Sequence, residues 1–243
     1  MTNLYDTIGL NYADLRRPDA RIAAKIDAAL DAAQTVLNVG AGSGGYEPTT
    51  KQVTAIEPSA EMIAQRPASG ATVLQGHAED LPFEDNSFDA AMASLTVHHW
   101  SNKAKGAREM RRVARNKIVF LTFDPAFQDF WLLHYFPELA TLDKAQMPPL
   151  SEYESWLGPV RISPVPIPQD CTDGFLAGYW KRPNAYLDPR VRSAMSSFWK
   201  IGDISDGLKC LHADLDSGAW ETRYAELLNL EELDCGYRLV ETV

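Results

Sequence analysis

Short apolar runs alternate with helical stretches through the first half of this 243-residue chain. The runs typical of strands cover residues 35–41, 52–58, 71–77, 87–97 and 117–123. They are short and nearly continuous, as expected for strands that helices bury on both faces. Amphipathic spacing and capping residues predict helices over 19–33, 59–66 and 101–115. This alternation predicts an α/β fold with parallel βαβ units in an open, doubly wound sheet.

The sequence changes character after Asp124. Aromatic and proline-rich segments follow, and five of the six tryptophans lie beyond residue 130. We expect residues 1–125 to carry a ligand-binding part, and residues 126–243 to complete the sheet and form a cap over a substrate pocket. The side chains that could line this pocket are Trp100, Trp131, Tyr135, Asp170, Cys171, Asp173, Tyr179 and Trp180. The alternative, in which the tryptophans simply fill the core, stays open.

Composition excludes several classes of protein. The chain has 23 basic and 33 acidic residues, a formal charge of −10, which argues against a nucleic-acid partner. It contains no uninterrupted apolar stretch long enough to span a membrane. Its N-terminus lacks the apolar core of a signal peptide, so we expect a cytoplasmic protein. Neither the three cysteines nor the five histidines show the spacing of a metal site or a disulfide framework.

Three predicted strands are followed by residues suited to a ligand that contains adenosine. A glycine-rich turn, Gly40–Gly45, follows the first strand and can bring backbone N–H groups close to a ligand. Glu57 ends the second strand, where a carboxylate can accept hydrogen bonds from ribose hydroxyls. After the third strand, Ala78 and Glu79 can offer a backbone amide and a carboxylate to the edge of an adenine ring. Because ligands bind beyond the carboxyl ends of such strands, the three segments predict one site.

The connection between the first two strands is unusually short. Glu57 follows Gly42 by only 15 residues, and Pro48 cannot lie inside a helix. We therefore expect a loop or a stub in place of the first crossover helix. Dinucleotide-binding folds use that helix to face a pyrophosphate, with the acid about 20 residues beyond the motif. The short connection disfavours NAD and suits a ligand without phosphate.

The motifs VLNVGAGSG, AIEPSAEM, GHAEDLPFEDNSFDAAMASLTVHHW and REMRRVAR together resemble those of the class I S-adenosylmethionine-dependent methyltransferases. The resemblance covers about residues 1–125. It implies a Rossmann-like, mostly parallel seven-stranded sheet that binds S-adenosylmethionine. Asn38 departs from the pattern because the family usually has Asp there, and we expect weaker cofactor affinity as a result. The resemblance also implies transfer of a methyl group to a small-molecule acceptor.

Residue by residue, the resemblance implies distinct roles in holding the cofactor. Gly40, Ala41 and Gly42 would wrap the methionine moiety, and Glu57 would hold the ribose. The resemblance implies that further residues flank the adenine, contact its edge, close over the ligand or pair with its charged end. These residues are Tyr12, Arg16, Asn38, Pro58, Met62, Ala78, Glu79 and Leu95.

His98 and His99 lie where the acceptor is expected, and either could accept its proton. The alternative is that one packs and the other caps the following helix. Two other functions stay open: a protein of this fold that binds the cofactor without methylating, and, less favoured, an NAD(P)-dependent oxidoreductase. The acceptor and the oligomeric state do not follow from the sequence.

Overall fold

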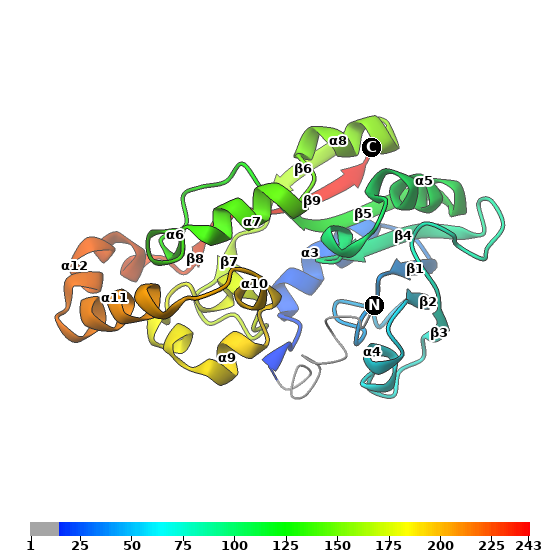
Figure 1. The fold of residues 1–243 in the computed structure, drawn as a ribbon. Helices are drawn as coiled ribbons and strands as arrows, with labels where there is room; N and C mark the ends of the chain where they lie inside the picture. The colour runs from blue at the N-terminus through cyan, green and yellow to red at the C-terminus, as the bar shows by residue number, and fades with distance from the viewer. Residues whose placement is uncertain (1–14) are drawn as a thin grey trace.

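A seven-stranded sheet forms the centre of the computed structural model, which describes residues 15–243 (Figure 1). The strand order is β3-β2-β1-β4-β5-β9-β6. Neighbouring strands from β3 to β5 are parallel, whereas β9 runs antiparallel to both β5 and β6. The strands are β1 (Thr35–Val39), β2 (Gln52–Glu57), β3 (Thr72–Gln75), β4 (Phe88–Ser94), β5 (Ala114–Phe123), β6 (Val160–Pro164) and β9 (Tyr237–Thr242). The predicted doubly wound, mostly parallel sheet is confirmed.

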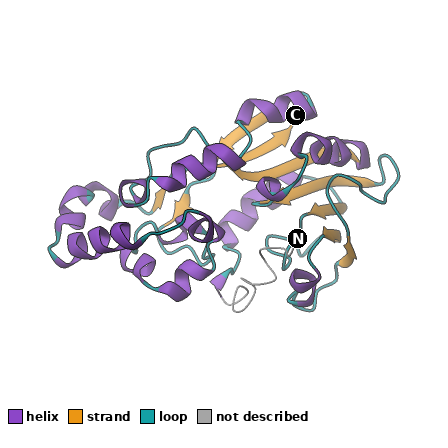
Figure 2. Cartoon of the chain, in the orientation of Figure 1, coloured by secondary structure: helices purple, strands orange, loops and turns teal. Residues whose placement is uncertain are grey.

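Helices cover both faces of this sheet (Figure 2). On one face, α3 (Ala20–Leu30) packs Ile22 and Ile26 against the strands, and Asp19 caps it by accepting from the N–H of Arg21. On the other, α5 (Lys103–Val113) packs together with α8 (Leu150–Leu157). The central strands are buried on both sides, so their sequences are nearly continuous in apolar residues rather than alternating.

The connection from β1 to β2 contains no helix, as predicted. The next connection does: α4 (Ala60–Ala64) is one short helix, and the Ser59 hydroxyl caps it by accepting from the N–H of Met62. A side-chain cap of this kind satisfies a backbone donor that a helix start leaves without a partner. These two connections bring the turn after β1 and the residues after β2 to the same edge of the sheet.

Most of residues 126–243 form an insertion between β5 and β9, which also contains the edge strand β6. Figure 1 shows α9, α11 and α12 of this insertion gathered to one side of the sheet. Its further elements are α6 (Leu132–Tyr135), α7 (Glu138–Gln146), β7 (Ile167–Pro168), α9 (Pro189–Ser193), α10 (Ser196–Lys200), α11 (Ser205–Asp216), α12 (Ala219–Arg223) and β8 (Glu232–Leu233).

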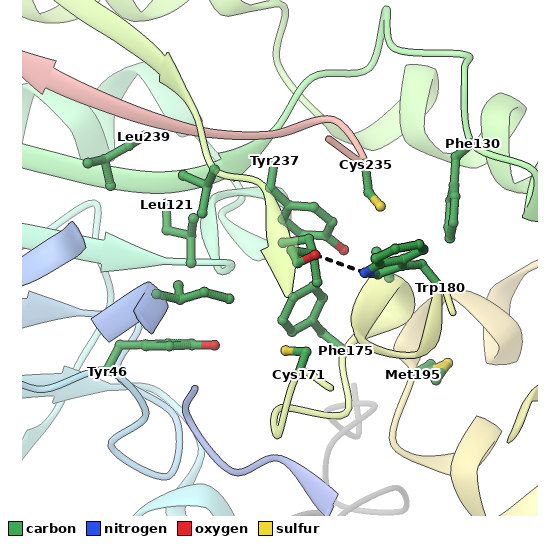
Figure 3. Packing of buried hydrophobic residues seen from close by; sticks show 14 of the residues in the cluster. Tyr46, Leu121, Phe130, Cys171, Phe175, Trp180, Met195, Cys235, Tyr237 and Leu239 are labelled. Atoms are coloured by element: carbon green, nitrogen blue, oxygen red, sulfur yellow. Dashed lines mark hydrogen bonds between the residues drawn. The ribbon is translucent and has the colours of Figure 1, made fainter. Parts of the chain in front are cut away.

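Aromatic side chains of the insertion mainly build a core. Trp180 is fully buried, and its indole Nε1 donates to the backbone oxygen of Ile167 at 2.8 Å (Figure 3). Trp131 is buried against Trp220, with ring centroids 5.2 Å apart. Placing Trp131 and Trp180 in a pocket wall was therefore wrong: both lie in the core, where their large apolar surface joins the insertion to the sheet.

None of the helices within residues 15–243 is long and apolar enough to cross a membrane. In the same residues no three histidine, cysteine, aspartate or glutamate side chains gather as metal ligands. All three cysteines are free: Cys171 and Cys235 are buried, and Cys210 is exposed.

Candidate functional site

A cavity of about 600 Å³ opens at the carboxyl ends of β1, β2 and β4. It brings together most of the predicted cofactor-binding residues: Arg16, Gly40, Ala41, Gly42, Glu57, Pro58, Met62, Ala78, Glu79 and Leu95. His99 and Trp100 also line it. Tyr12 lies outside the described residues. Asn38 does not line the cavity, although it is buried next to the turn.

The turn after β1 is fixed against the end of β2. The N–H groups of Gly40 and Ala41 both donate to the carbonyl of Ile56, at 2.9 and 3.0 Å. Gly40 has φ +69°, and a Cβ atom there would lie 2.2 Å from the Thr96 hydroxyl oxygen. Only glycine therefore lets the backbone pass this close to the residues after β4. The sequence pattern alone did not indicate the contact with Thr96.

Glu57 is one of the acidic residues that line the cavity, together with Glu79 and Asp173. One of its carboxylate oxygens accepts from the N–H of Gly42 at 2.7 Å, and the other accepts from the N–H of Ser59 at 3.0 Å. Burial raises the pKa of Glu57, although these two hydrogen bonds oppose the rise. A carboxylate has about four acceptor positions, so two bonds to the backbone leave capacity for a ligand that donates hydrogen bonds.

The segment after β3 meets the start of α5 at the far wall of the cavity. A carboxylate oxygen of Glu79 accepts from the Ser101 hydroxyl and from the N–H of Asn102, both at 2.9 Å. Burial acts to raise the pKa of Glu79, but these hydrogen bonds outweigh it, so its pKa lies below the usual value. The side chain is therefore an ionised hydrogen-bond acceptor beside Ala78, at the position predicted to contact an adenine edge.

Asn38 belongs to a network beneath the turn. Its Nδ2 donates to the Glu47 carboxylate at 3.0 Å, and Arg66 pairs with the same carboxylate at 2.6 Å. A guanidinium nitrogen of Arg66 also donates to the carbonyl of Gly42 at 3.2 Å. Glu47 and Arg66 thus tie the short connection to the glycine turn and to α4. Sequence analysis did not identify either residue, because nothing in their spacing indicates that they meet.

Asp173 reaches the cavity from the C-terminal insertion. It is 2% exposed and receives hydrogen bonds from the Nε of Arg16 at 2.6 Å and the Tyr46 hydroxyl at 2.8 Å. It was predicted only as a possible anchor of the acceptor. The structure makes it the meeting point of the N-terminal segment, the β1–β2 connection and the insertion. Asp170 instead pairs with Arg21 on the surface, and Cys171 is buried.

His98 and His99 differ in where they face. His99 lines the cavity described above, whereas His98 lines a second, smaller one. Their ring centroids are 3.8 Å apart. The His99 ring is accessible at the cavity wall, but the enclosing protein, with the charges of Lys200 and Lys103, lowers the pKa of His99. Burial and the nearby His99 lower the pKa of His98 well below the usual value. Both imidazoles are therefore neutral near neutral pH.

Two further residues predicted for the acceptor pocket lie in neither cavity. Tyr135 donates from its hydroxyl to Asp214 at 2.7 Å, and it packs edge-on against Trp131. Tyr179 lies in η2 (Leu176–Tyr179), with the Arg182 guanidinium over its ring. Placing them in that pocket was wrong, because packing within the insertion uses both aromatic rings.

Comparison with known proteins shows the family to which the chain belongs. The model of a family described as a methyltransferase domain matches residues 37–121, which include the glycine turn, Glu57 and Glu79. A solved structure of a candidate methyltransferase from an antibiotic biosynthesis pathway of Anabaena variabilis is 35% identical. The similarity covers 94% of this chain and 99% of that protein, with a TM-score of 0.87. The chain belongs to the class I S-adenosylmethionine-dependent methyltransferases.

Two curated relatives share shorter segments. An uncharacterised methyltransferase of Bacillus subtilis, YcgJ, is 31% identical over 45% of this chain. A 2-methyl-6-phytyl-1,4-hydroquinone methyltransferase of Arabidopsis thaliana is 28% identical over 60% of it. The aligned part spans 44% and 41% of the lengths of these relatives.

Proposed function

We propose that this protein is an enzyme that transfers the methyl group of S-adenosylmethionine to a small-molecule acceptor. The observation that carries the proposal is the position of Glu57. Its carboxylate closes the cavity at the end of β2, directly against the N–H of Gly42 in the turn after β1. This places a hydrogen-bond acceptor suited to ribose hydroxyls beside a turn that has no following helix for a pyrophosphate.

The described residues fit this cofactor. The volume of about 600 Å³ lies in the range of small-molecule sites. Gly40, Ala41 and Gly42 would hold the methionine moiety, and Glu57 would hold the ribose. Pro58, Met62, Ala78, Glu79 and Leu95 would contact the adenine or close over the cofactor, and Arg16 would pair with its carboxylate. Asn38 would act indirectly, by holding Glu47 beneath the turn.

S-adenosylmethionine supplies a methyl group on a positively charged sulfur, so it is already activated for displacement. The protein then has to hold the two partners in line and exclude water. The turn and Glu57 would hold the cofactor, and the residues after β4 would hold the acceptor. His98 and His99 follow β4, and burial lowers the pKa of both imidazoles, so each is neutral but a weaker base than an ordinary histidine.

Isothermal titration of the purified protein with S-adenosylmethionine, S-adenosylhomocysteine and NAD tests the cofactor. We expect binding of both adenosyl ligands and none of NAD. Glu57→Ala removes the carboxylate that would accept from the ribose. It should lower the affinity for both adenosyl ligands by more than about ten-fold, which corresponds to about 1.4 kcal/mol. Glu61→Ala is the matched control, because Glu61 carries the same charge but is exposed on α4.

The possible outcomes separate the candidate functions. Binding of NAD without either adenosyl ligand would overturn the proposal in favour of a nucleotide-dependent oxidoreductase. Equal loss of binding in the Glu57 and Glu61 variants would show that net charge, rather than a ribose contact, controls affinity. If the adenosyl ligands bind, an acceptor screen that follows S-adenosylhomocysteine release tests methyl transfer. If the methyl group of the bound cofactor is lost only to water and to no acceptor, the protein binds the cofactor without acting as a methyltransferase.

A further inference from the structure

The glycine turn after β1 has no helix behind it. In dinucleotide-binding folds such a turn opens a helix, whose N-terminus brings roughly half an elementary positive charge to the ligand site. Here the connection from β1 to β2 contains no helix. Gly40, Gly42, Gly44 and Tyr46 all have positive φ, so the backbone of the turn is irregular. Groups from outside the turn therefore have to hold its peptide groups in place.

Arg66 holds the turn from behind. It follows α4, its side chain is 5% exposed, and it does not line the large cavity. Its Nη1 donates to the carbonyl of Gly42 at 3.2 Å, while the N–H of the same glycine donates to Glu57. A Cβ atom at Gly44 would lie 3.0 Å from Nη2 of Arg66, so the guanidinium packs directly on the backbone there. Gly42 is thus fixed through both its N–H and its carbonyl.

Glu47 fixes the guanidinium in turn. Nη2 of Arg66 donates to both carboxylate oxygens of Glu47, at 2.7 and 2.6 Å, and Asn38 donates to one of them at 3.0 Å. Nε of Arg66 is buried and has no hydrogen-bond partner within residues 15–243. A buried ion pair with an unsatisfied donor is a poor source of stability. Its position beneath the turn therefore points to a role in the site.

The charge of Arg66 also acts on Glu57. Burial raises the pKa of Glu57, and the N–H groups of Ser59 and Gly42, followed by the charges of Arg66 and His77, oppose the rise. Hydrogen bonds to an ionised carboxylate are roughly twice as strong as those between neutral groups. Arg66 keeps its charge at every physiological pH, whereas a histidine does not. The other titratable side chains that line the cavity are Arg16, Asp173, Glu79 and His99.

We propose that Arg66 is a positioning residue of the cofactor site, which holds Gly42 and brings to the turn the positive charge that a crossover helix would otherwise supply. The inference rests on the proposed function, since it takes Glu57 as the group that would hold the ribose. It adds that Arg66 sets the pH at which Glu57 loses its charge and the cofactor its affinity. A purely structural ion pair would change the affinity by the same factor at every pH.

Opposite charge changes in the two members of the pair give the sharpest test. Protein with ¹³C at Cδ of its glutamates is titrated with acid in the absence of ligand, and the Glu57 resonance is assigned by its absence in Glu57→Gln. Arg66→Met removes the positive charge and should raise the pKa of Glu57. Glu47→Gln removes the negative charge, keeps an acceptor for Arg66 and should lower the pKa of Glu57. Each comparison is repeated in a His77→Gln background, because the charge of His77 also acts on Glu57.

The affinity for S-adenosylhomocysteine gives a second readout. We expect Arg66→Met to weaken binding about ten-fold near neutral pH. As the pH falls, its affinity should decline from a higher pH than that of wild type, because Glu57 takes up its proton earlier. Arg66→Lys keeps the charge, but its single nitrogen cannot hold Glu47 and Gly42 in the same way. It should restore the pH profile without restoring the full affinity.

Arg112→Met is the matched control. Arg112 lies on α5 and, like Arg66, donates both to a carboxylate and to backbone carbonyls. It does not line the large cavity. The titration of Glu57 and the pH profile of binding should be those of wild type in this variant.

The outcomes distinguish this inference from the proposed function. An unchanged Glu57 titration in Arg66→Met, a shift in the same direction in both charge variants, or an affinity deficit that is equal at every pH overturns the inference. Should Arg66→Met not fold, Glu47→Gln decides alone, since only a lowered pKa of Glu57 agrees with the inference. If S-adenosylhomocysteine fails to bind wild type while Glu57 responds as expected, the proposed cofactor is wrong and the action of Arg66 on Glu57 stands.

Discussion

Asp173 and Arg16 lie 157 residues apart in the chain and are joined by a hydrogen bond of 2.6 Å between carboxylate oxygen and Nε. Their backbones also form an isolated antiparallel bridge, so the contact is more than an ion pair. Asp173 receives a second hydrogen bond from Tyr46 of the β1–β2 connection. The wall of the large cavity is therefore built by three segments that a single carboxylate holds together.

Asp173→Asn tests how much this carboxylate stabilises the fold. The change keeps the shape of the side chain but removes the carboxylate charge that pairs with Arg16. Because the site is largely buried, we expect a loss of about 2–3 kcal/mol in the free energy of unfolding, measured with urea. Tyr46→Phe removes only one neutral donor and should cost about 1 kcal/mol. An unchanged urea midpoint for Asp173→Asn would contradict a structural role of the pair.

Asn38→Asp would place a carboxylate against that of Glu47, since 3.0 Å separates the present amide nitrogen and the carboxylate oxygen. We expect a loss of about 1–2 kcal/mol in the free energy of unfolding near pH 7, with Arg66 limiting the repulsion.

The neighbouring carboxylate raises the pKa of the introduced one, so the variant should regain stability relative to wild type as the pH falls. Unfolding curves at neutral and mildly acidic pH measure this, and a difference independent of pH would argue against repulsion. The sequence also predicts that the same variant binds the cofactor more tightly. Titration with S-adenosylhomocysteine distinguishes this gain in affinity from the loss of affinity that a disturbed turn would cause.

Gly40→Ala should be more damaging than a glycine substitution elsewhere. The new methyl group would meet the side chain of Thr96 and would also require a left-handed backbone conformation. We expect a loss of about 3 kcal/mol in unfolding free energy, with loss of adenosyl binding.

Gly202→Ala is the matched control, because Gly202 has a similar φ of +80° and no atom within 4 Å of the point where its new methyl group would lie. Its cost should be about 1–2 kcal/mol, the backbone contribution alone. If the two variants unfold at the same urea concentration, the contact with Thr96 has no energetic weight.

Asp143 should make stability depend on pH. Burial raises its pKa to about 6 from the usual 3.8, although the charge of Lys200 opposes the rise. The folded state therefore holds this proton more tightly than the unfolded chain. The stabilisation from protonated Asp143 is fully present below the unfolded value and is lost as the pH rises through about 6. It amounts to at most about 3 kcal/mol.

Asp143→Asn removes that dependence. We expect the stability of the variant relative to wild type to increase between about pH 4 and pH 7, measured by urea unfolding at several pH values. Groups that titrate equally in both proteins cancel in the difference, so the slope of the relative stability reports on Asp143. Parallel pH profiles for the two proteins would place the Asp143 carboxyl in a hydrated environment instead.

The order of local patterns along the chain predicted the sheet and the edge at which the large cavity lies. Strand runs, glycine spacing and acids at strand ends are short-range features, and the carboxyl ends of parallel strands converge on one edge. That is why Gly40, Glu57 and Glu79 lie in one cavity, as expected from sequence. The missing crossover helix was equally predictable, because Pro48 and the short interval leave no room for one.

What the sequence by itself determined is thus the class of fold and the edge of the sheet where the large cavity opens. Only the tertiary structure decided which residues from distant segments meet there. It brings Asp173 to Arg16 and Tyr46, joins Asn38 to Glu47, and separates His98 from His99 into two cavities. Such contacts depend on how the insertion packs against the sheet. Packing is set by the combined shape and volume of many side chains, and these properties leave no periodic pattern in a sequence.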